Sequence, residues 1–253
     1  MNRKSFFWKT LTALTIAGSL AACSSTNDDT STASFAQQLT SSDRPDADKL
    51  RDAGRKPAEV MAFWGVKPGM TVLEVLSSGG YYTEVLSQKV TETGKVYAQN
   101  NRFILDVLDG RFGKEFNQRL ENNRLSNVKH YIKEFGEFDI KNEVDVITVV
   151  LNYHDMYSNF SKEKRMKVLA QFKAALKPGG IVGVIDMESK NGNQKDLHRI
   201  SQDLVIKDFE AAGFTLEAEA NFLKNPNDDY SKLVFDPSVR GKTDRFIFKF
   251  KKA

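Results

Sequence analysis

Two kinds of apolar segment alternate along most of this 253-residue chain, and the alternation constrains the fold more than any other feature. Short β-branched runs, typical of buried strands, stand between longer stretches whose apolar residues recur at helical spacing. Strands that alternate with helices predict an α/β protein with a mainly parallel sheet covered on both faces. The expected strands are 71–76, 96–98, 128–132, 144–151, 181–187, 214–220 and 246–250, and the expected helices are 57–64, 81–90, 102–122, 161–176 and 198–212.

The N-terminus has the pattern of an export signal. Arg3, Lys4 and Lys9 precede an apolar run over residues 11–22, which is too short to span a bilayer but suits a signal peptide. The run ends in the sequence LAACS, which places the only cysteine of the chain at Cys23. This ending resembles the lipobox of bacterial lipoprotein precursors, whose cysteine carries the lipid. An ordinary secretory signal with a chance cysteine is the alternative.

The resemblance implies three segments: a signal peptide over 1–22, a Ser/Thr-rich tether over 23–42, and one folded domain over 43–253. It also implies a cell-envelope lipoprotein held in a membrane through Cys23. Ser24 follows the cysteine where an aspartate would favour retention in the inner membrane. The expected location is therefore the periplasmic face of the outer membrane.

Charge and composition exclude several classes of function. Removal of residues 1–22 leaves 34 basic and 33 acidic residues, so bulk charge predicts no nucleic-acid partner. The domain has no cysteine, which excludes disulfides and thiolate chemistry. Its three histidines, His130, His154 and His198, form no pair at helical spacing. We therefore predict no metal site from the sequence.

Several landmarks come in the order seen in class I S-adenosylmethionine-dependent methyltransferases, and the chain resembles that family from about residue 57 to residue 251. Residues 72–80 (VLEVLSSGG) resemble the family's first motif, and residues 176–180 (LKPGG) resemble its turn into the fifth strand. The final RGKTDRF segment resembles a subgroup of exported predicted methyltransferases. The resemblance implies a seven-stranded, Rossmann-like sheet with an antiparallel last strand, and S-adenosylmethionine as cofactor.

A ligand of such a sheet binds beyond the carboxyl ends of the strands, where the strand order reverses. Glycines let the backbone approach it, and a helix N-terminus can stabilise a carboxylate. Leu76 replaces a family glycine, and the acid that usually ends the second strand is absent, so the cofactor site is altered. A tight strand–helix turn without a ligand is the alternative. The candidate cofactor-binding residues are Glu74, Ser78, Gly79, Gly80, Asn100 and Asn152.

The segment Asn152 to Asp155 leaves the fourth strand at the edge where the family transfers its methyl group. His154 is the candidate general base, because its ordinary pKa lies near neutrality. Asp155 could orient it, and Tyr153 could contact a substrate ring. The alternative is a capped loop in which the His154 side chain forms a hydrogen bond with the backbone.

The leading hypothesis is methyl transfer from S-adenosylmethionine to a small or envelope-associated molecule. The competing hypothesis is a non-catalytic ligand-binding or interaction lipoprotein on a degenerate methyltransferase scaffold. The replacements at Leu76 and Asn100, and export to a compartment where the cofactor is not expected to be plentiful, favour the second. The sequence does not determine the oligomeric state.

Overall fold

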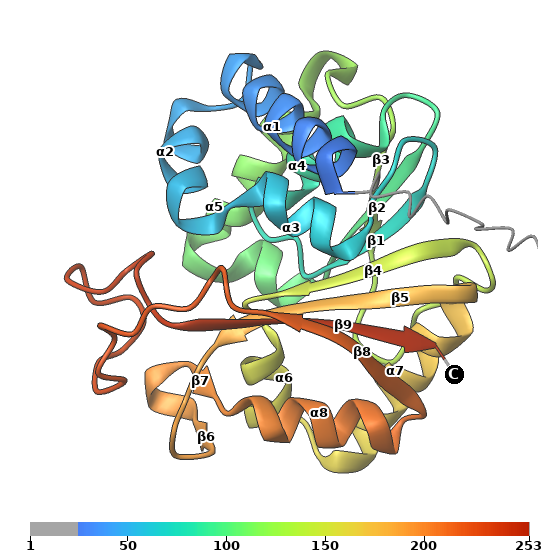
Figure 1. The fold of residues 1–253 in the computed structure, drawn as a ribbon. Helices are drawn as coiled ribbons and strands as arrows, with labels where there is room; N and C mark the ends of the chain where they lie inside the picture. Colours follow the sequence, from blue (N-terminus) through green and yellow to red (C-terminus); the bar gives the residue numbers. More distant parts are fainter. Residues whose placement is uncertain (1–24, 253) are drawn as a thin grey trace, which may run out of the picture.

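The computed structural model describes residues 25–252, which form a seven-stranded sheet with helices on both faces (Figure 1). The strand order is β3-β2-β1-β4-β5-β9-β8, and β9 runs antiparallel to its neighbours β5 and β8 while the other pairs are parallel. The predicted α/β class and the antiparallel last strand are confirmed. The strands are β1 (Thr71–Val75), β2 (Lys95–Asn100), β3 (Val128–Ile132), β4 (Val144–Val150), β5 (Leu176–Met187), β8 (Phe214–Ala220) and β9 (Arg245–Lys252).

The helices divide between the two faces of the sheet, with α1 to α5 on one and α6 to α8 on the other (Figure 1). Each face has its own apolar core, because successive side chains of a strand point to opposite sides. The helices are α1 (Ser25–Ser41), α2 (Asp46–Arg55), α3 (Pro57–Trp64), α4 (Tyr81–Val90), α5 (Arg102–Leu120), η1 (Glu121–Asn123), α6 (Tyr153–Asn159), α7 (Lys162–Ala175), η2 (Lys195–Leu197) and α8 (Gln202–Ala211).

Helix α1 corrects the predicted tether. Residues 25–41 are helical, and Phe35 and Leu39 are buried in the core that α3 and α4 share. Two apolar residues one turn apart are enough to dock a helix that is otherwise polar. The ordered body therefore begins before residue 43. The signal peptide and Cys23 lie outside the described residues, and the lipoprotein prediction stays untested.

Local sequence signals placed other boundaries correctly. Pro57 occupies the first turn of α3. The Ser161 side chain caps α7 by accepting a hydrogen bond from the backbone N–H of Lys164. Helix α5 is interrupted over residues 107–110, where four residues including Gly110 have non-helical backbone angles. The last predicted helix begins later than expected, at Gln202, because a small hairpin of β6 (Asn193–Gln194) and β7 (Arg199–Ile200) precedes it.

Trp64 anchors α3 to strands β5 and β9 of the sheet. Its indole N–H donates to the carbonyl of Phe248, 3.0 Å away, and its ring packs against Gly183 of β5. A Cβ atom at position 183 would overlap the ring, so this strand position requires glycine.

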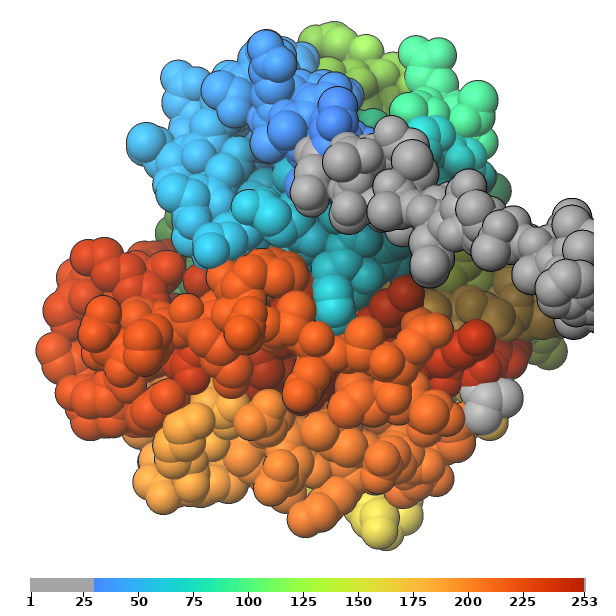
Figure 2. Space-filling model, in the orientation of Figure 1, coloured from blue at the N-terminus to red at the C-terminus, as the bar shows by residue number. Residues whose placement is uncertain are grey.

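A long connection over residues 221–244 joins β8 to β9. It forms a broad orange-red lobe at the left of the molecule in the space-filling view (Figure 2). Its length exceeds that of ordinary connections, which is typical of functional loops. Within residues 25–252, no helix combines the length and the apolar character needed to cross a membrane.

Candidate functional site

The carboxyl ends of β1 and β4 lie side by side where the strand order reverses, the position at which open α/β sheets bind ligands. The turn after β1 is unusually constrained, since Leu76, Ser78 and Gly80 all have positive φ angles of 53°, 52° and 85°. Leu76 and Ser78 hold a backbone conformation that non-glycine residues rarely adopt. The first motif therefore keeps a glycine-like turn although positions 76 and 78 are not glycine.

Asn152 connects the two strand ends. Its Nδ2 donates to the carbonyl of Val75, 2.9 Å away, while its Oδ1 is buried without a hydrogen-bond partner among residues 25–252. The hydroxyl oxygen of Ser77, in the turn after β1, is also buried and has no hydrogen-bond partner among residues 25–252. A buried acceptor without a donor is costly, so both atoms suit a ligand that brings N–H or O–H groups. An ammonium group and hydroxyl groups meet that requirement, and cofactor binding by Asn152 stays a prediction.

Asn100 holds the glycine turn in place. Its Oδ1 accepts from the backbone N–H of Ser78 at 2.8 Å, and its Nδ2 donates to the Ser78 carbonyl at 3.3 Å. The neighbouring Gln99 accepts a hydrogen bond from the backbone N–H of Leu76 through its Oε1, 2.9 Å away. These neutral amides thus fix the strained turn to the end of β2. A contact of Asn100 with a ribose hydroxyl stays a prediction.

Glu74 lies beneath the turn and faces α4. It is buried, and the Thr83 hydroxyl donates to its Oε2 at 2.5 Å. Burial raises the pKa of Glu74 to about 7, against the smaller lowering effects of the Thr83 hydrogen bond and of distant arginines. Among the described residues no cation forms an ion pair with Glu74. A buried carboxylate without a cationic partner is suited to attract a cationic ligand.

Gly79 and Gly80 bring the turn close to α5. Arg119 Nε donates to the Gly79 carbonyl at 2.5 Å, and a Cβ atom at Gly80 would lie 2.9 Å from Arg119 Cδ. Gly80 also precedes the first residue of α4 as its N-cap. These glycines are therefore needed for helix packing, whether or not a ligand also uses the space.

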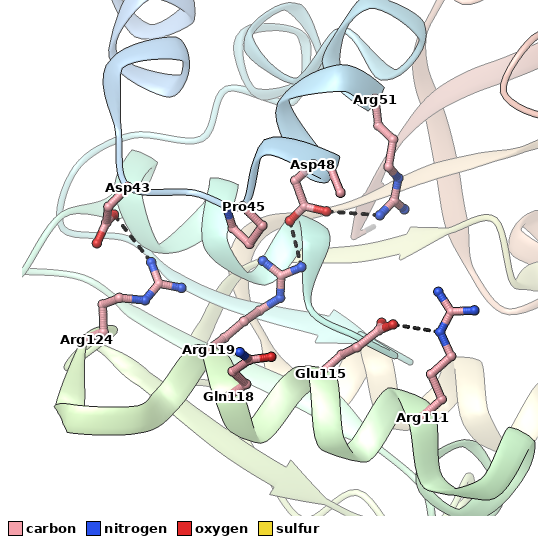
Figure 3. Close-up of a pocket in the computed structure, with 10 residues that line it drawn as sticks. Asp43, Pro45, Asp48, Arg51, Arg111, Glu115, Gln118, Arg119 and Arg124 are labelled. Carbon is pink, nitrogen blue, oxygen red and sulfur yellow. Dashed lines mark hydrogen bonds and ion pairs between the residues drawn. The ribbon is translucent and has the colours of Figure 1, made fainter.

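A polar cavity of about 450 Å³ lies between α2 and α5 beside this turn (Figure 3). Arg119 forms one wall, pairs with Asp48 at 2.6 Å and with Glu84 at 2.6 Å, and so links the cavity to the glycine turn. Sequence reasoning missed this cavity because it did not predict α2. Its lining is charged, with arginines and acids in near balance: Asp43, Asp48, Arg51, Arg111, Glu115, Arg119 and Arg124.

His154 is held rigidly at the start of α6. Its Nδ1 lies 2.7 Å from Asp186 Oδ1, and its backbone N–H donates to Asp186 Oδ2 at 2.8 Å. Asp186 is fully buried at the end of β5, so it, rather than Asp155, orients the imidazole. Burial acts to lower the pKa of His154, but the charge and hydrogen bond of Asp186, with the charge of Asp155, raise it overall.

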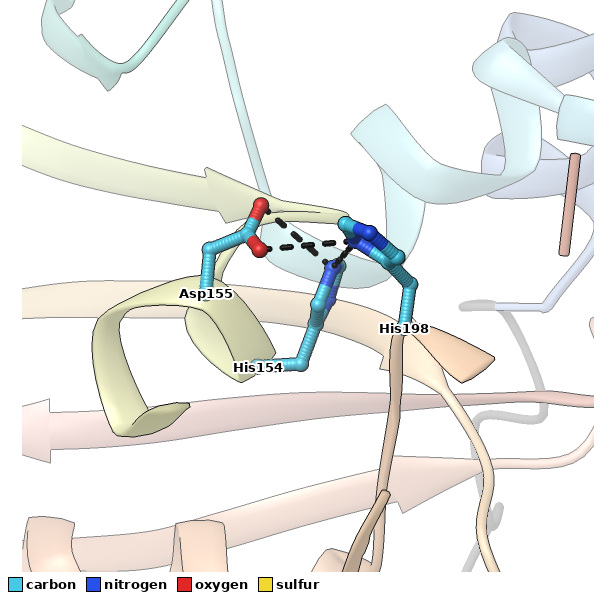
Figure 4. A group of neighbouring side chains, drawn as sticks. All are labelled: His154, Asp155 and His198. Atoms are coloured by element: carbon cyan, nitrogen blue, oxygen red, sulfur yellow. Dashed lines mark hydrogen bonds and ion pairs between the residues drawn. The ribbon is translucent and has the colours of Figure 1, made fainter. Parts of the chain in front are cut away.

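The other nitrogen of His154 points into a small group of side chains (Figure 4). His154 Nε2 lies 3.1 Å from His198 Nδ1 and 3.4 Å from Asp155 Oδ2, and His198 Nδ1 lies 3.4 Å from Asp155 Oδ1. Sequence reasoning found His154 and Asp155 but not the grouping, because 44 residues separate the two histidines. A buried acid at the end of β5 was the signal that could have identified Asp186.

Tyr153 does not face the site, which corrects its predicted contact with a substrate ring. Its side chain is fully buried, its hydroxyl donates to Asp208 Oδ2 at 3.0 Å, and its ring packs against Phe209. Helix α6 was not predicted, and in it consecutive residues point in different directions. His154 reaches the ligand-facing edge, so Tyr153 must turn inward, where it anchors α6 to α8.

Comparisons with solved structures support the strand topology. A SAM-dependent methyltransferase from Aquifex aeolicus matches with a TM-score of 0.60 and 23% sequence identity, over 81% of this chain and 96% of its own. This chain has the class I methyltransferase fold. The glycopeptide N-methyltransferase MtfA, complexed with sinefungin, matches with a TM-score of 0.55 and 12% identity, over 79% of this chain and 86% of its own.

The same methyltransferase fold also includes a different reaction. The [4+2]-cyclase SpnF matches with a TM-score of 0.53 and 15% identity, over 79% of this chain and 80% of its own. No protein-family model and no curated protein matches the sequence. At these identities the comparisons establish the fold alone, because one fold supports several different reactions.

Proposed function

We propose that the chain is an S-adenosylmethionine-dependent methyltransferase that acts on a small or envelope-associated acceptor. The proposal is supported mainly by the buried Oδ1 of Asn152, which has no hydrogen-bond partner within residues 25–252 and lies where the strand order reverses. Asn152 donates to the end of β1, the strand that carries the buried Glu74 and leads into the strained turn that ends at Gly80. Sinefungin, present with MtfA, is an analogue of the same cofactor.

In this proposal the protein contributes mainly by holding the two reactants in line. Bound S-adenosylmethionine supplies a methyl group on a sulfonium ion. Asn152 and Glu74 would hold its ammonium and hydroxyl groups, and the N-terminus of α4 would stabilise its carboxylate. His154 presents Nε2 at the neighbouring edge, where it could take the proton of an oxygen or nitrogen nucleophile.

Calorimetric titration of S-adenosylmethionine and S-adenosylhomocysteine into the full chain in mild detergent tests the proposal. We expect dissociation constants in the micromolar range, and Asn152→Ala should weaken binding at least about tenfold because the buried acceptor is lost. Asn117→Ala, an exposed change on α5, is the control and should bind like wild type. No binding up to about 1 mM would refute the proposal and leave the non-catalytic scaffold as the better account.

We also propose that the chain is exported and anchored through Cys23, on the periplasmic face of the outer membrane. The support is the signal pattern and the single cysteine at its end. More than one acyl chain is needed for stable anchoring. We expect radiolabelled palmitate to label the wild type and Ser24→Ala, whereas Cys23→Ser should take up no label and keep its first 22 residues. Equal labelling of Cys23→Ser would contradict the anchor.

A further inference from the structure

We infer that His154, His198 and Asp155 form a binding site for one divalent transition-metal ion, at the open edge of the sheet beside the proposed methyl-transfer site. The three residues each present one ligand atom, and these atoms all lie within 4.8 Å of one another (Figure 4). No established property of the chain and no part of the proposed function requires this site.

The spacing of the ligand atoms suits coordination. Ligand atoms about 2.1 Å from one ion are separated by about 3.0 Å in octahedral geometry and about 3.4 Å in tetrahedral geometry. The two nitrogens, His154 Nε2 and His198 Nδ1, lie 3.1 Å apart, which falls in that interval. Asp155 presents Oδ2 3.4 Å from the first nitrogen and Oδ1 3.4 Å from the second. An ion could therefore enter with only small movements of the side chains.

The surroundings prepare His154 to act as a ligand. Asp186, buried on the far side of the ring, accepts the Nδ1 proton at 2.7 Å and so leaves a lone pair on Nε2. A carboxylate behind a ligating histidine is the usual outer partner in protein metal sites, where it fixes the tautomer and the ring orientation. The backbone N–H groups of His154 and Met187 hold the same carboxylate in place.

The other two ligands leave the site accessible. His198 and Asp155 are partly exposed, with side-chain exposures of 33% and 45%. His198 is positioned by the connection over 221–244, whose Phe235 ring lies 5.0 Å from its imidazole. Three protein ligands with the remaining positions open to solvent are typical of a reactive metal centre rather than a structural one.

The ligand types determine the class of ion. Two imidazoles and one carboxylate select zinc, iron, cobalt or manganese over magnesium and calcium, which prefer oxygen ligands alone. An ion here would take an oxygen or nitrogen group of a small molecule in its open position. His154 Nε2 cannot bind the ion and accept a proton at once, so metal binding would replace its role as a base.

The test is a titration of Zn²⁺ into the full chain, purified without a polyhistidine tag and stripped with chelator, with Co²⁺ absorption as a second readout. We expect one equivalent to bind with micromolar or tighter affinity. His198→Gln and Asp155→Asn should each weaken binding at least about tenfold, and Asp186→Asn by about 10- to 100-fold. Both direct ligands are partly exposed, so these variants should fold.

His130→Gln changes the one histidine of the domain outside the cluster, and Asp109→Asn changes an exposed aspartate of α5. Both controls should bind metal like wild type. Absence of saturable Zn²⁺ binding, or equal binding by His198→Gln and Asp155→Asn, would overturn the inference. No cofactor or acceptor is present in this titration, so its result is independent of the methyl-transfer proposal.

Discussion

Asp228→Ala is expected to lower the free energy of unfolding by about 3 to 5 kcal/mol, because it leaves a buried arginine without its counter-ion. Asp228 accepts from both terminal nitrogens of Arg199, at 2.8 and 3.1 Å, and both side chains are almost completely buried. It also accepts the backbone N–H groups of Asp244 and Tyr230. The Asp228 carboxylate thus links the connection over residues 221–244 to β7, the strand that begins at Arg199.

Urea denaturation followed by circular dichroism measures the loss, and Asp229→Ala is the matched control. Asp229 is adjacent and exposed, and its Oδ1 accepts from the backbone N–H and the hydroxyl of Ser231, so we expect a loss of no more than about 1 kcal/mol there. An Asp228→Ala protein that unfolds within about 1 kcal/mol of wild type would show that Arg199 finds water or another partner.

Much of the fold was predictable from the sequence because buried parallel strands leave a strong local signal. The seven predicted strand segments all occur in the sheet, since runs such as residues 144–150 have few stable alternatives to a buried strand. Helix α1 was missed because its two buried residues, Phe35 and Leu39, are isolated in a polar segment. Their burial depends on a surface that other elements provide.

The site was less predictable, because its geometry comes from residues far apart in the sequence. The histidine at position 154 was found from its place after β4, yet its partners Asp186 and His198 come from β5 and the segment after it. Tyr153 was assigned to the site only because it precedes His154, and the unpredicted helix α6 turns it into the core. Proximity in sequence indicated the edge of the sheet but not the direction of each side chain.

Glu74→Gln is expected to stabilise the protein at pH 8 by about 3 kcal/mol and to have little effect at pH 4. Burial raises the pKa of Glu74 to about 7 in the folded state, whereas the ordinary value is 4.5. The folded state therefore binds more protons than the unfolded chain between these values, so wild-type stability falls as pH rises through this interval. Glutamine removes that dependence and keeps an acceptor for Thr83.

Glu84→Gln provides the control with the opposite sign. Burial acts to raise the pKa of Glu84, but hydrogen bonds and charges of Arg124 and Arg119 lower it overall. Its contribution to stability is present above the ordinary pKa and is lost as pH falls, so Glu84→Gln should destabilise at pH 8 and less so at pH 4. Urea denaturation at pH 4 and pH 8 measures the free energy of unfolding of both variants. If Glu74→Gln has the same free energy of unfolding as wild type at both pH values, Glu74 is solvated and the prediction is wrong.

The same variant connects stability with binding. A buried, unpaired carboxylate that destabilises the fold near neutral pH is the kind of residue that proteins retain at ligand sites. If Glu74 attracts the ammonium group of S-adenosylmethionine, Glu74→Gln should bind the cofactor at least about tenfold more weakly while unfolding at higher urea concentration. Unchanged affinity in the stabilised variant would remove Glu74 from the cofactor site and leave Asn152 and the turn at Gly80 as its remaining contacts.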